Sequence, residues 1–172
     1  MPQRTDAFDL ARLGLTSGEG RRLELHTGIA PFDYGGQRYE VDEKLVPMRL
    51  DVSRTMGSGW ALRLRFEAGV TGPCMRCLDP ADQRFEVEVR EVHQPGAGDE
   101  LQSPYVDGDG ELDVEGWARD ALALALPAQI VCRPDCAGLC AQCGANLNDD
   151  PEHRHEGEPD QRWAKLSELR FD

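Results

Sequence analysis

Four cysteines and two histidines lie close together near the end of this chain. They form a C-x-x-x-C pair, a C-x-x-C pair and an H-x-H sequence, made by Cys132, Cys136, Cys140, Cys143, His153 and His155. Thiolate and imidazole are the ligands that Zn²⁺ prefers, and a structural zinc site takes four of them in a tetrahedron. The segment therefore predicts a structural zinc ion.

Six candidate ligands are more than one zinc ion can bind, so two arrangements remain open. Cys140 and Cys143 belong to both, because Gly144 after them permits the tight turn that lets two thiolates converge. The other two positions go either to the C-x-x-x-C pair, which gives an all-cysteine site, or to the two histidines. We favour the histidines, since the C-x-x-C turn and the H-x-H sequence flank a short loop, as in a zinc ribbon.

Each group also has a simpler interpretation. Free cysteines are often small buried hydrophobic residues, although the Asp, Arg and Gly residues between these four do not resemble a core segment. The two histidines stand in the sequence EHRHE, which could be a solvated acidic loop.

Cys74 and Cys77 form a further C-x-x-C pair, placed between two expected strands. A redox thiol usually lies at a helix N-terminus, and no helix is expected after this pair. The position favours a structural turn, with half of a metal site as an alternative. Six cysteines and two histidines are enough ligands for two sites, but the count alone does not establish a second one.

The sequence carries no recognisable catalytic motif. It lacks the G-x-S-x-G, phosphate-loop and G-x-G-x-x-G patterns. A zinc ion whose four positions are filled by protein has no open position for water and is structural. We therefore expect no catalytic residues, no small-molecule substrate and no enzyme activity.

The cysteines must be positioned by a sheet and one helix. Alternating apolar residues predict strands around residues 46–52, 60–66 and 85–90, with shorter strands near Leu23 and Tyr39. Apolar residues at helical spacing, from Val114 to Ala125 and including Leu124, follow the N-cap candidate Asp113 and precede Pro127. The fold class is α+β: an antiparallel sheet or small meander barrel, packed with a helix and followed by a zinc-binding segment.

The expected organisation has four parts. Residues 1–94 form the β region, 95–111 a loop or linker, 112–131 the helix with an extended segment, and 132–172 the zinc-binding segment with a short terminal helix over 160–171.

The net charge of −13 limits the classes of partner. Non-specific nucleic acid binding relies on Lys and Arg, so direct RNA contact is less expected than contact with a basic protein. No apolar run reaches the roughly 20 residues that span a bilayer, and the N-terminus has no secretion signal pattern. We expect a cytoplasmic protein with reduced thiols and no membrane contact.

Four blocks in this order resemble one known family. GPCMRCLDP, ALALPAQIVC, CRPDCAGLCAQCGANLN and DQRWAKLSEL are similar to the large ribosomal RNA subunit accumulation, or YceD-like, family, over roughly residues 20–170. Many members close the cysteine block with C-x-C, where this chain has His153 and His155. The usual Asp-Pro-Arg before the last helix is Asp160-Gln161-Arg162 here.

The resemblance implies a non-enzymatic factor for large-subunit ribosomal RNA accumulation and ribosome assembly. The gene commonly neighbours one for a large-subunit ribosomal protein, so the expected partner is a basic ribosomal protein or a pre-ribosomal particle. A thiol oxidoreductase or another protein-binding zinc ribbon is the alternative.

Overall fold

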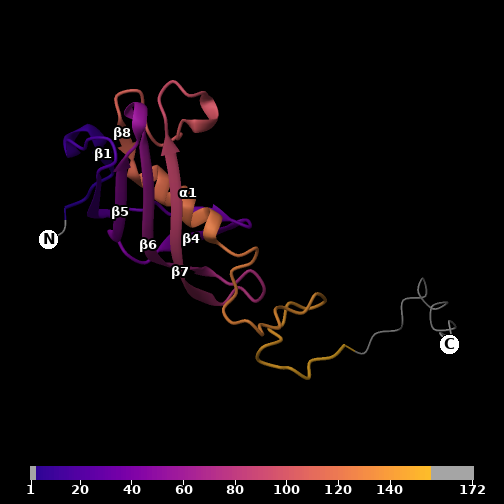
Figure 1. Ribbon diagram of the computed structural model, residues 1–172. Helices are drawn as coiled ribbons and strands as arrows, with labels where there is room; N and C mark the ends of the chain where they lie inside the picture. Colours follow the sequence, from indigo (N-terminus) through magenta and orange to yellow (C-terminus); the bar gives the residue numbers. More distant parts are fainter. Residues whose placement is uncertain (1–2, 156–172) are drawn as a thin grey trace, which may run out of the picture.

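A six-stranded antiparallel sheet forms the centre of the protein in the computed structural model, which describes residues 3–155 (Figure 1). Its strands are β2 (Gly20–Thr27), β3 (Phe32–Tyr34), β4 (Gln37–Val41), β5 (Val46–Arg54), β6 (Trp60–Pro73) and β7 (Pro80–His93). The order is β2-β5-β6-β7, and the far end of β6 also pairs with β4, which pairs with β3. Within residues 3–155, β2 and β7 lie at opposite edges, so the sheet is open and not a closed barrel.

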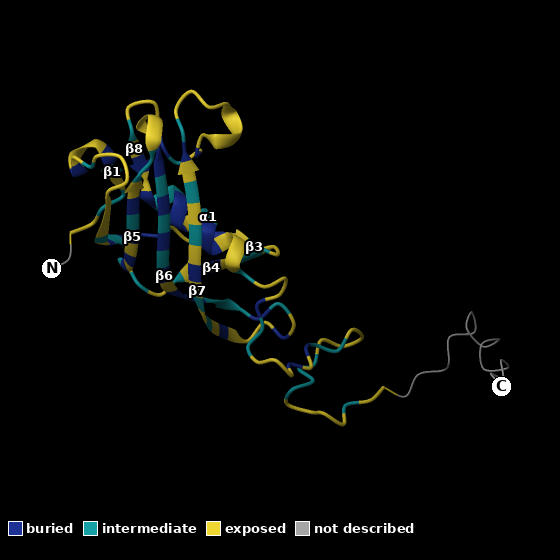
Figure 2. Ribbon diagram, viewed as in Figure 1, coloured by how far each residue is buried: buried dark blue, intermediate teal, exposed yellow. Residues whose placement is uncertain are grey.

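The alternating pattern predicted for the strands is confirmed. Val46, Met48, Leu50 and Val52 of β5 are buried, and so are the matching residues of β6, Trp60, Leu62, Leu64 and Phe66. Figure 2 shows buried and more exposed positions alternating along β5, β6 and β7. Residues on one face of a strand alternate with those on the other, so these side chains form one apolar face.

The helix α1 (Val114–Ala125) packs against the six-stranded sheet through contacts with β7, and it also contacts the short strand β1 (Ala7–Asp9). Asp113 is its N-cap, as predicted, and its carboxylate accepts a hydrogen bond from the Gly116 amide at 2.8 Å. Val114, Trp117 and Leu122 are buried, but Leu124 is 84% exposed. The prediction that Leu124 and Ala125 belong to the buried stripe is wrong, because the last turn of the helix leaves both residues exposed to solvent.

Two short strands and three 3₁₀ helices complete the described part. Strands β1 (Ala7–Asp9) and β8 (Glu111–Asp113) pair in a separate two-stranded sheet, and the 3₁₀ helices are η1 (Leu10–Leu13), η2 (Met56–Ser58) and η3 (Asp99–Leu101). The segment expected as a loop or linker is anchored in the core, since Val106 is buried and the Tyr105 ring stacks on Trp117 at 6.0 Å. The expected terminal helix over 160–171 lies outside the described residues.

Tyr39 holds the end of the sheet where β6 turns into β7. Its hydroxyl donates a hydrogen bond to the Pro73 carbonyl at 2.8 Å, and a Cβ atom on Gly72 would lie 2.3 Å from the Tyr39 ring. Glycine at position 72 is therefore required for the ring to approach the backbone. The contact fixes the strand residue immediately before Cys74.

Candidate metal centre

The structure gathers eight cysteine and histidine side chains into two groups, each of which could hold a metal ion. The inner cluster consists of Cys74, Cys77, Cys132 and Cys136, and the outer cluster of Cys140, Cys143, His153 and His155. The candidate ligand atoms of each group lie within 4.8 Å of one another. All six cysteines are free thiols.

The inner cluster joins two segments that are distant in sequence. Cys74 and Cys77 lie on the turn between β6 and β7, whereas Cys132 and Cys136 follow α1. The Sγ atoms of Cys74 and Cys136 are 3.8 Å apart, and those of Cys77 and Cys132 are 3.5 Å apart. A tetrahedral zinc ion with Zn–S bonds of about 2.3 Å holds its sulfurs about 3.8 Å apart. The observed spacing suits such an ion.

The outer cluster is more exposed and has mixed ligands. The Cys140 Sγ atom lies 3.1 Å from Nε2 of His155, and the Cys143 Sγ atom lies 3.3 Å from Nε2 of His153. The two Nε2 atoms are 2.9 Å apart. These distances are within about half an ångström of the edges of a tetrahedron with zinc–ligand bonds of 2.0–2.3 Å. The donor set and its spacing fit one zinc ion.

Both C-x-x-C pairs have the same backbone geometry. The amide of Leu78 donates to the Cys74 carbonyl at 3.0 Å, and the amide of Gly144 donates to the Cys140 carbonyl at 2.8 Å. The amides of Cys74 and Cys140 in turn donate to the carbonyls five residues later, at 2.7 and 2.8 Å. The turn expected of a zinc knuckle therefore occurs twice.

Hydrogen bonds attach the segment after α1 to the β6–β7 turn. The amide of Met75 donates to the Ile130 carbonyl at 2.9 Å, and the amide of Leu139 donates to the Arg76 carbonyl at 3.1 Å. The side chain of Asn146 adds a bond to the Asp79 carboxylate at 2.8 Å. The two clusters therefore share one frame at one end of the sheet (Figure 1).

Local hydrogen bonds favour the thiolate form by lowering the pKa of Cys74 and Cys136 in the inner cluster and of Cys140 in the outer cluster. Burial would raise the pKa of Cys74, but amide donors from Cys77, Arg76 and Cys132 outweigh burial and lower this pKa to about 6. The amides of Cys143 and Gln142 lower the pKa of Cys140 to about 6. Burial raises the pKa of Cys77 well above its usual range. Metal ligands must be deprotonated, so the lowered pKa values of Cys74 and Cys140 favour the form of each thiol that binds a metal.

The structure sorts the residues that the sequence singled out. The favoured set of Cys140, Cys143 and the two histidines forms one group, whereas Cys132 and Cys136 lie in the other. The all-cysteine alternative is therefore not assembled as a single group. Cys74 and Cys77 form the strand-connecting turn that was expected, and they also form half of a four-ligand group, which had been an alternative. The number of ligands, six cysteines and the two histidines of the H-x-H sequence, agrees with two four-ligand groups, but the spacing within each pair does not indicate which pairs meet.

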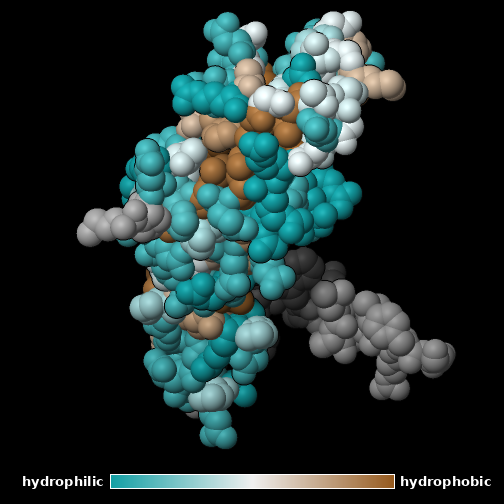
Figure 3. Space-filling model, turned by 60° about the vertical axis from the view of Figure 1, so that its left-hand side comes forward, coloured by the Kyte–Doolittle hydropathy of each residue, from teal (hydrophilic) through white to brown (hydrophobic). Residues whose placement is uncertain are grey.

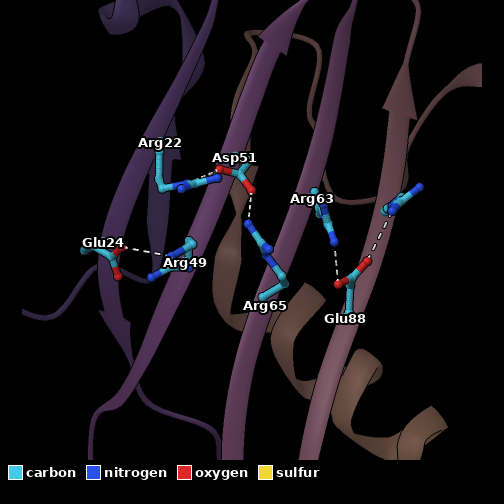
Figure 4. A network of polar contacts seen from close by, with 8 residues as sticks. Arg22, Glu24, Arg49, Asp51, Arg63, Arg65 and Glu88 are labelled. Atoms are coloured by element: carbon cyan, nitrogen blue, oxygen red, sulfur yellow. Dashed lines mark hydrogen bonds and ion pairs between the residues drawn. The ribbon is translucent and has the colours of Figure 1, made fainter.

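A second polar feature covers the outer face of the sheet (Figure 4). Arg22 and Arg65 both pair with Asp51, the first at 2.6 Å, and Arg49 pairs with Glu24 at 3.1 Å. On the far strands, Arg63 and Arg90 pair with Glu88 at 2.6 and 3.3 Å. These arginines are engaged by carboxylates of the same face, so they are not a row of free cations for phosphate binding.

No helix among residues 3–155 is both long and apolar enough to cross a membrane.

Comparison with known proteins places the chain in a family. The family described as "Large ribosomal RNA subunit accumulation protein YceD" matches residues 62–170. An uncharacterized protein of Mycobacterium tuberculosis is 38% identical over 168 residues, which cover 94% of this chain and 79% of the relative. One from Mycobacterium leprae is 33% identical over the same length, covering 94% of this chain and 76% of the relative.

A relative with an informative name comes from a plant. The "Large ribosomal RNA subunit accumulation protein YCED homolog 1, chloroplastic" of Zea mays is 35% identical over 77 residues, which cover 45% of this chain and 22% of that protein. No solved structure matches the chain. The family match contains all eight candidate ligands, and the chain belongs to the YceD family of large ribosomal RNA subunit accumulation proteins.

Proposed function

We propose that this protein supports the accumulation of large-subunit ribosomal RNA and the assembly of the large ribosomal subunit, without catalysing a reaction. The observation that supports the proposal best is the family match over residues 62–170, because it spans the long hairpin, the helix and both clusters. Ribosome assembly would place it in the cytoplasm, where thiols stay reduced and available to metals.

In this proposal the outer cluster holds one structural zinc ion. Cys140, Cys143, His153 and His155 would fill all four positions, so the ion would have no open position for water or substrate. Zinc would stabilise a segment that has little core of its own, since Cys143 and His155 are exposed.

The ligand set can be tested with cobalt-substituted protein. Thiolate-to-metal charge transfer grows with each sulfur ligand, so a site with two sulfurs differs from one with four. Cys74→Ser/Cys77→Ser protein leaves only the outer cluster intact and should give the two-sulfur spectrum. A four-sulfur spectrum from this variant would contradict the assignment of the histidines.

A basic large-subunit ribosomal protein is the proposed partner. Between residues 94 and 118 the chain has seven carboxylates and no Lys, Arg or His: Asp99, Glu100, Asp107, Asp109, Glu111, Asp113 and Glu115. All but Glu115 are exposed. The loop that carries most of them lies at the opposite end of the sheet from the two clusters (Figure 1). It offers a concentrated negative surface to a basic protein.

One face of the protein offers mainly polar groups for contact with a partner. The face drawn in Figure 3 is mostly hydrophilic, with a limited hydrophobic area. Association driven by exposed charges is faster at low salt and weakens once screening acts over about 8 Å, near 0.15 M salt. Binding to the partner should therefore fall as salt rises above that value.

The role is tested by depleting the protein and measuring both ribosomal subunits. We expect mature large-subunit RNA and large subunits to fall while small subunits are retained. An equal loss of both subunits, or no loss, would contradict the assembly role. The partner is tested by Asp99→Asn/Glu100→Gln/Asp109→Asn, with Asp33→Asn/Glu40→Gln/Glu86→Gln as a control of equal charge. Only the loop variant should lose salt-sensitive capture of ribosomal protein from lysate treated with ribonuclease.

The alternative role as a thiol oxidoreductase receives less support. The sulfur atoms of Cys74 and Cys77 are in buried residues, with 0% and 3% exposure, so a disulfide substrate could not reach them. A disulfide-exchange assay with the purified protein would show no turnover above that of a Cys74→Ser variant.

A further inference from the structure

We propose that Cys74, Cys77, Cys132 and Cys136 hold a second zinc ion, which joins the β6–β7 turn to the segment after α1. This site does not depend on the ribosomal role, and it is separate from the ion proposed for the outer cluster. It assigns a function to the C-x-x-C pair of Cys74 and Cys77, whose position between two strands predicts a structural turn.

The spacing of the sulfurs supports ligands around an ion. The two measured Sγ separations, 3.8 Å and 3.5 Å, lie close to the edge of about 3.8 Å in a ZnS₄ tetrahedron. A disulfide needs sulfurs about 2.05 Å apart. Four sulfurs that all lie within 4.8 Å of one another, with none bonded, surround a central point instead of forming two pairs.

Hydrogen-bond donors point at these sulfurs. The amide of Arg76 donates to the Cys74 Sγ atom at 3.4 Å, and the side-chain amide of Asn148 donates to the Cys136 Sγ atom at 3.5 Å. Sulfur that accepts such bonds carries negative charge more easily than a thiol packed only by apolar groups. Several thiolates buried together require a cation to compensate their charge. A bound ion satisfies that requirement, whereas four packed thiols would leave the donors with weak acceptors.

The surrounding structure is built to hold the four ligands in place. The hydroxyl of Tyr39 fixes Pro73 directly before the first cysteine pair. Gln83 of β7 donates to the Val131 carbonyl at 2.7 Å, directly before the second pair. Each half of the site is thus anchored to the sheet by a side chain adjacent to it. Four protein sulfurs leave no open coordination position, so the ion has a structural and not a catalytic role.

Zinc is the expected metal because structural sites made of four cysteines hold zinc. The four sulfurs lie within 4.8 Å of one another and so suit a single ion, whereas the four cysteines of an iron–sulfur cluster bind different iron atoms. The test is metal analysis of the full chain, purified under reducing conditions with zinc present. We expect two zinc ions per chain. X-ray absorption at the zinc edge should show an average of three sulfurs and one nitrogen per ion, since six sulfurs and two nitrogens serve two ions.

Variants separate the two sites. Cys132→Ser should lower the zinc content by at least one ion per chain, whereas Cys132→His, which replaces one zinc ligand with another, should restore it. His153→Ala/His155→Ala should remove one ion and leave a second that is coordinated by four sulfurs. The last variant keeps the proposal testable even if Cys132→Ser does not fold.

Three results would overturn the proposal. The first is a zinc content of one ion per chain that does not fall in Cys132→Ser. The second is the recovery of the inner cysteines as disulfides from protein kept anaerobic. The third is iron, in place of zinc, in protein from cells supplied with both metals. Normal levels of ribosomal subunits in a strain that carries Cys132→His would not outweigh any of these results, because the metal content is measured separately from the ribosomal role.

Discussion

Leu78 and Gly144 occupy the same position, directly after a C-x-x-C pair, and both have left-handed backbone angles, with φ of 66° and 75°. Glycine adopts this conformation freely, whereas a residue with a Cβ atom is strained by about 1–2 kcal/mol. Leu78 is 55% exposed, so burial of its side chain offsets little of that cost. The turn of the inner cluster therefore has a strained leucine at the position where the turn of the outer cluster has a glycine, which adopts this conformation without strain.

Replacing this leucine with glycine should stabilise the protein. We expect Leu78→Gly to raise the free energy of unfolding by about 1 kcal/mol or less, because relief of strain is partly offset by the greater freedom of glycine in the unfolded chain. Urea unfolding at constant zinc concentration measures the change. Leu78→Ala is the matched control, since it retains the Cβ atom and should gain nothing. A loss of stability in Leu78→Gly would show that the Leu78 side chain makes contacts worth more than its strain.

Asn148 supports the inner cluster, and its removal should loosen that site. Its side-chain carbonyl accepts a bond from the Ala137 amide at 2.7 Å, and its amide donates to the Cys136 Sγ atom and to Asn146. Residues that orient metal ligands commonly contribute about 10-fold or more to metal affinity. We expect Asn148→Ala to release zinc to a chromogenic chelator about 10-fold faster, and Asp149→Ala, which is exposed, to behave like the parent protein. Equal rates of zinc release from the parent protein and both variants would show that Asn148 does not hold the metal ligands in place.

Disrupting the outer cluster should unfold only the end of the described chain. Cys140→Ser or Cys143→Ser should release the outer ion, because a structural zinc site needs all four of its protein ligands and each variant removes one of them. The sheet should survive, since its core consists of residues such as Leu50, Leu64 and Trp117, which are distant in sequence from the cluster. Hydrogen exchange checks this: amides after residue 137 should lose protection while those of β5 and β6 keep it. Loss of protection throughout β6 would contradict the separation.

The ion pairs on the outer face of the sheet give a pH-dependent contribution through Asp51. Its hydrogen bond from Arg22 and its pairing with Arg65 hold the pKa of Asp51 below its ordinary value, despite partial burial. A carboxyl group with a depressed folded-state pKa contributes stability above its unfolded pKa of about 3.9, and the contribution disappears as pH falls through the folded value. We expect Asp51→Asn to cost about 1 kcal/mol near neutral pH and progressively less below pH 4 or so.

The measurement compares unfolding free energies of Asp51→Asn and the parent protein at each pH, so that pH effects on the metal sites cancel. The Asp33→Asn variant is the control, because Asp33 is exposed on β3. A difference between Asp51→Asn and the parent that stays constant through acid pH would contradict the assignment.

The parts of the fold that sequence predicts are those governed by local periodicity. Trp60, Leu62 and Leu64 alternate with polar residues and are buried, and Asp113 caps the helix as its position before an apolar stripe indicates. The short pairing of β1 with β8 carries no such signal, because three residues are too few to show a period. Leu124 fits the helical spacing of apolar residues but is exposed. Helical spacing shows which residues share one side of a helix, but it does not show where the sheet that covers this side ends.

Ligand identity was similarly predictable, but the partition of ligands was not. Cys140 and Cys143 approach the histidines across a loop of nine residues, and nearness in sequence was a sufficient guide. Cys77 and Cys132 are 55 positions apart and meet only because β7 and α1 bring the chain back to the same end of the sheet. Spacing within a motif gives no information on which distant motif completes it.

The meeting of Cys77 with Cys132 also has a consequence for the unfolded chain. An ion held by both sulfurs closes a ring that contains β7, β8 and α1, in the manner of a covalent cross-link. For as long as both sulfurs keep the ion in the unfolded chain, closing a loop of about 55 residues lowers the conformational entropy of that chain and favours the folded state by about 4 kcal/mol. The net stability of a small domain is about 5–15 kcal/mol, so this contribution would be a large fraction of it. The helix and the edge strand would then remain docked for as long as the metal is bound, and chelation would cut the ring open.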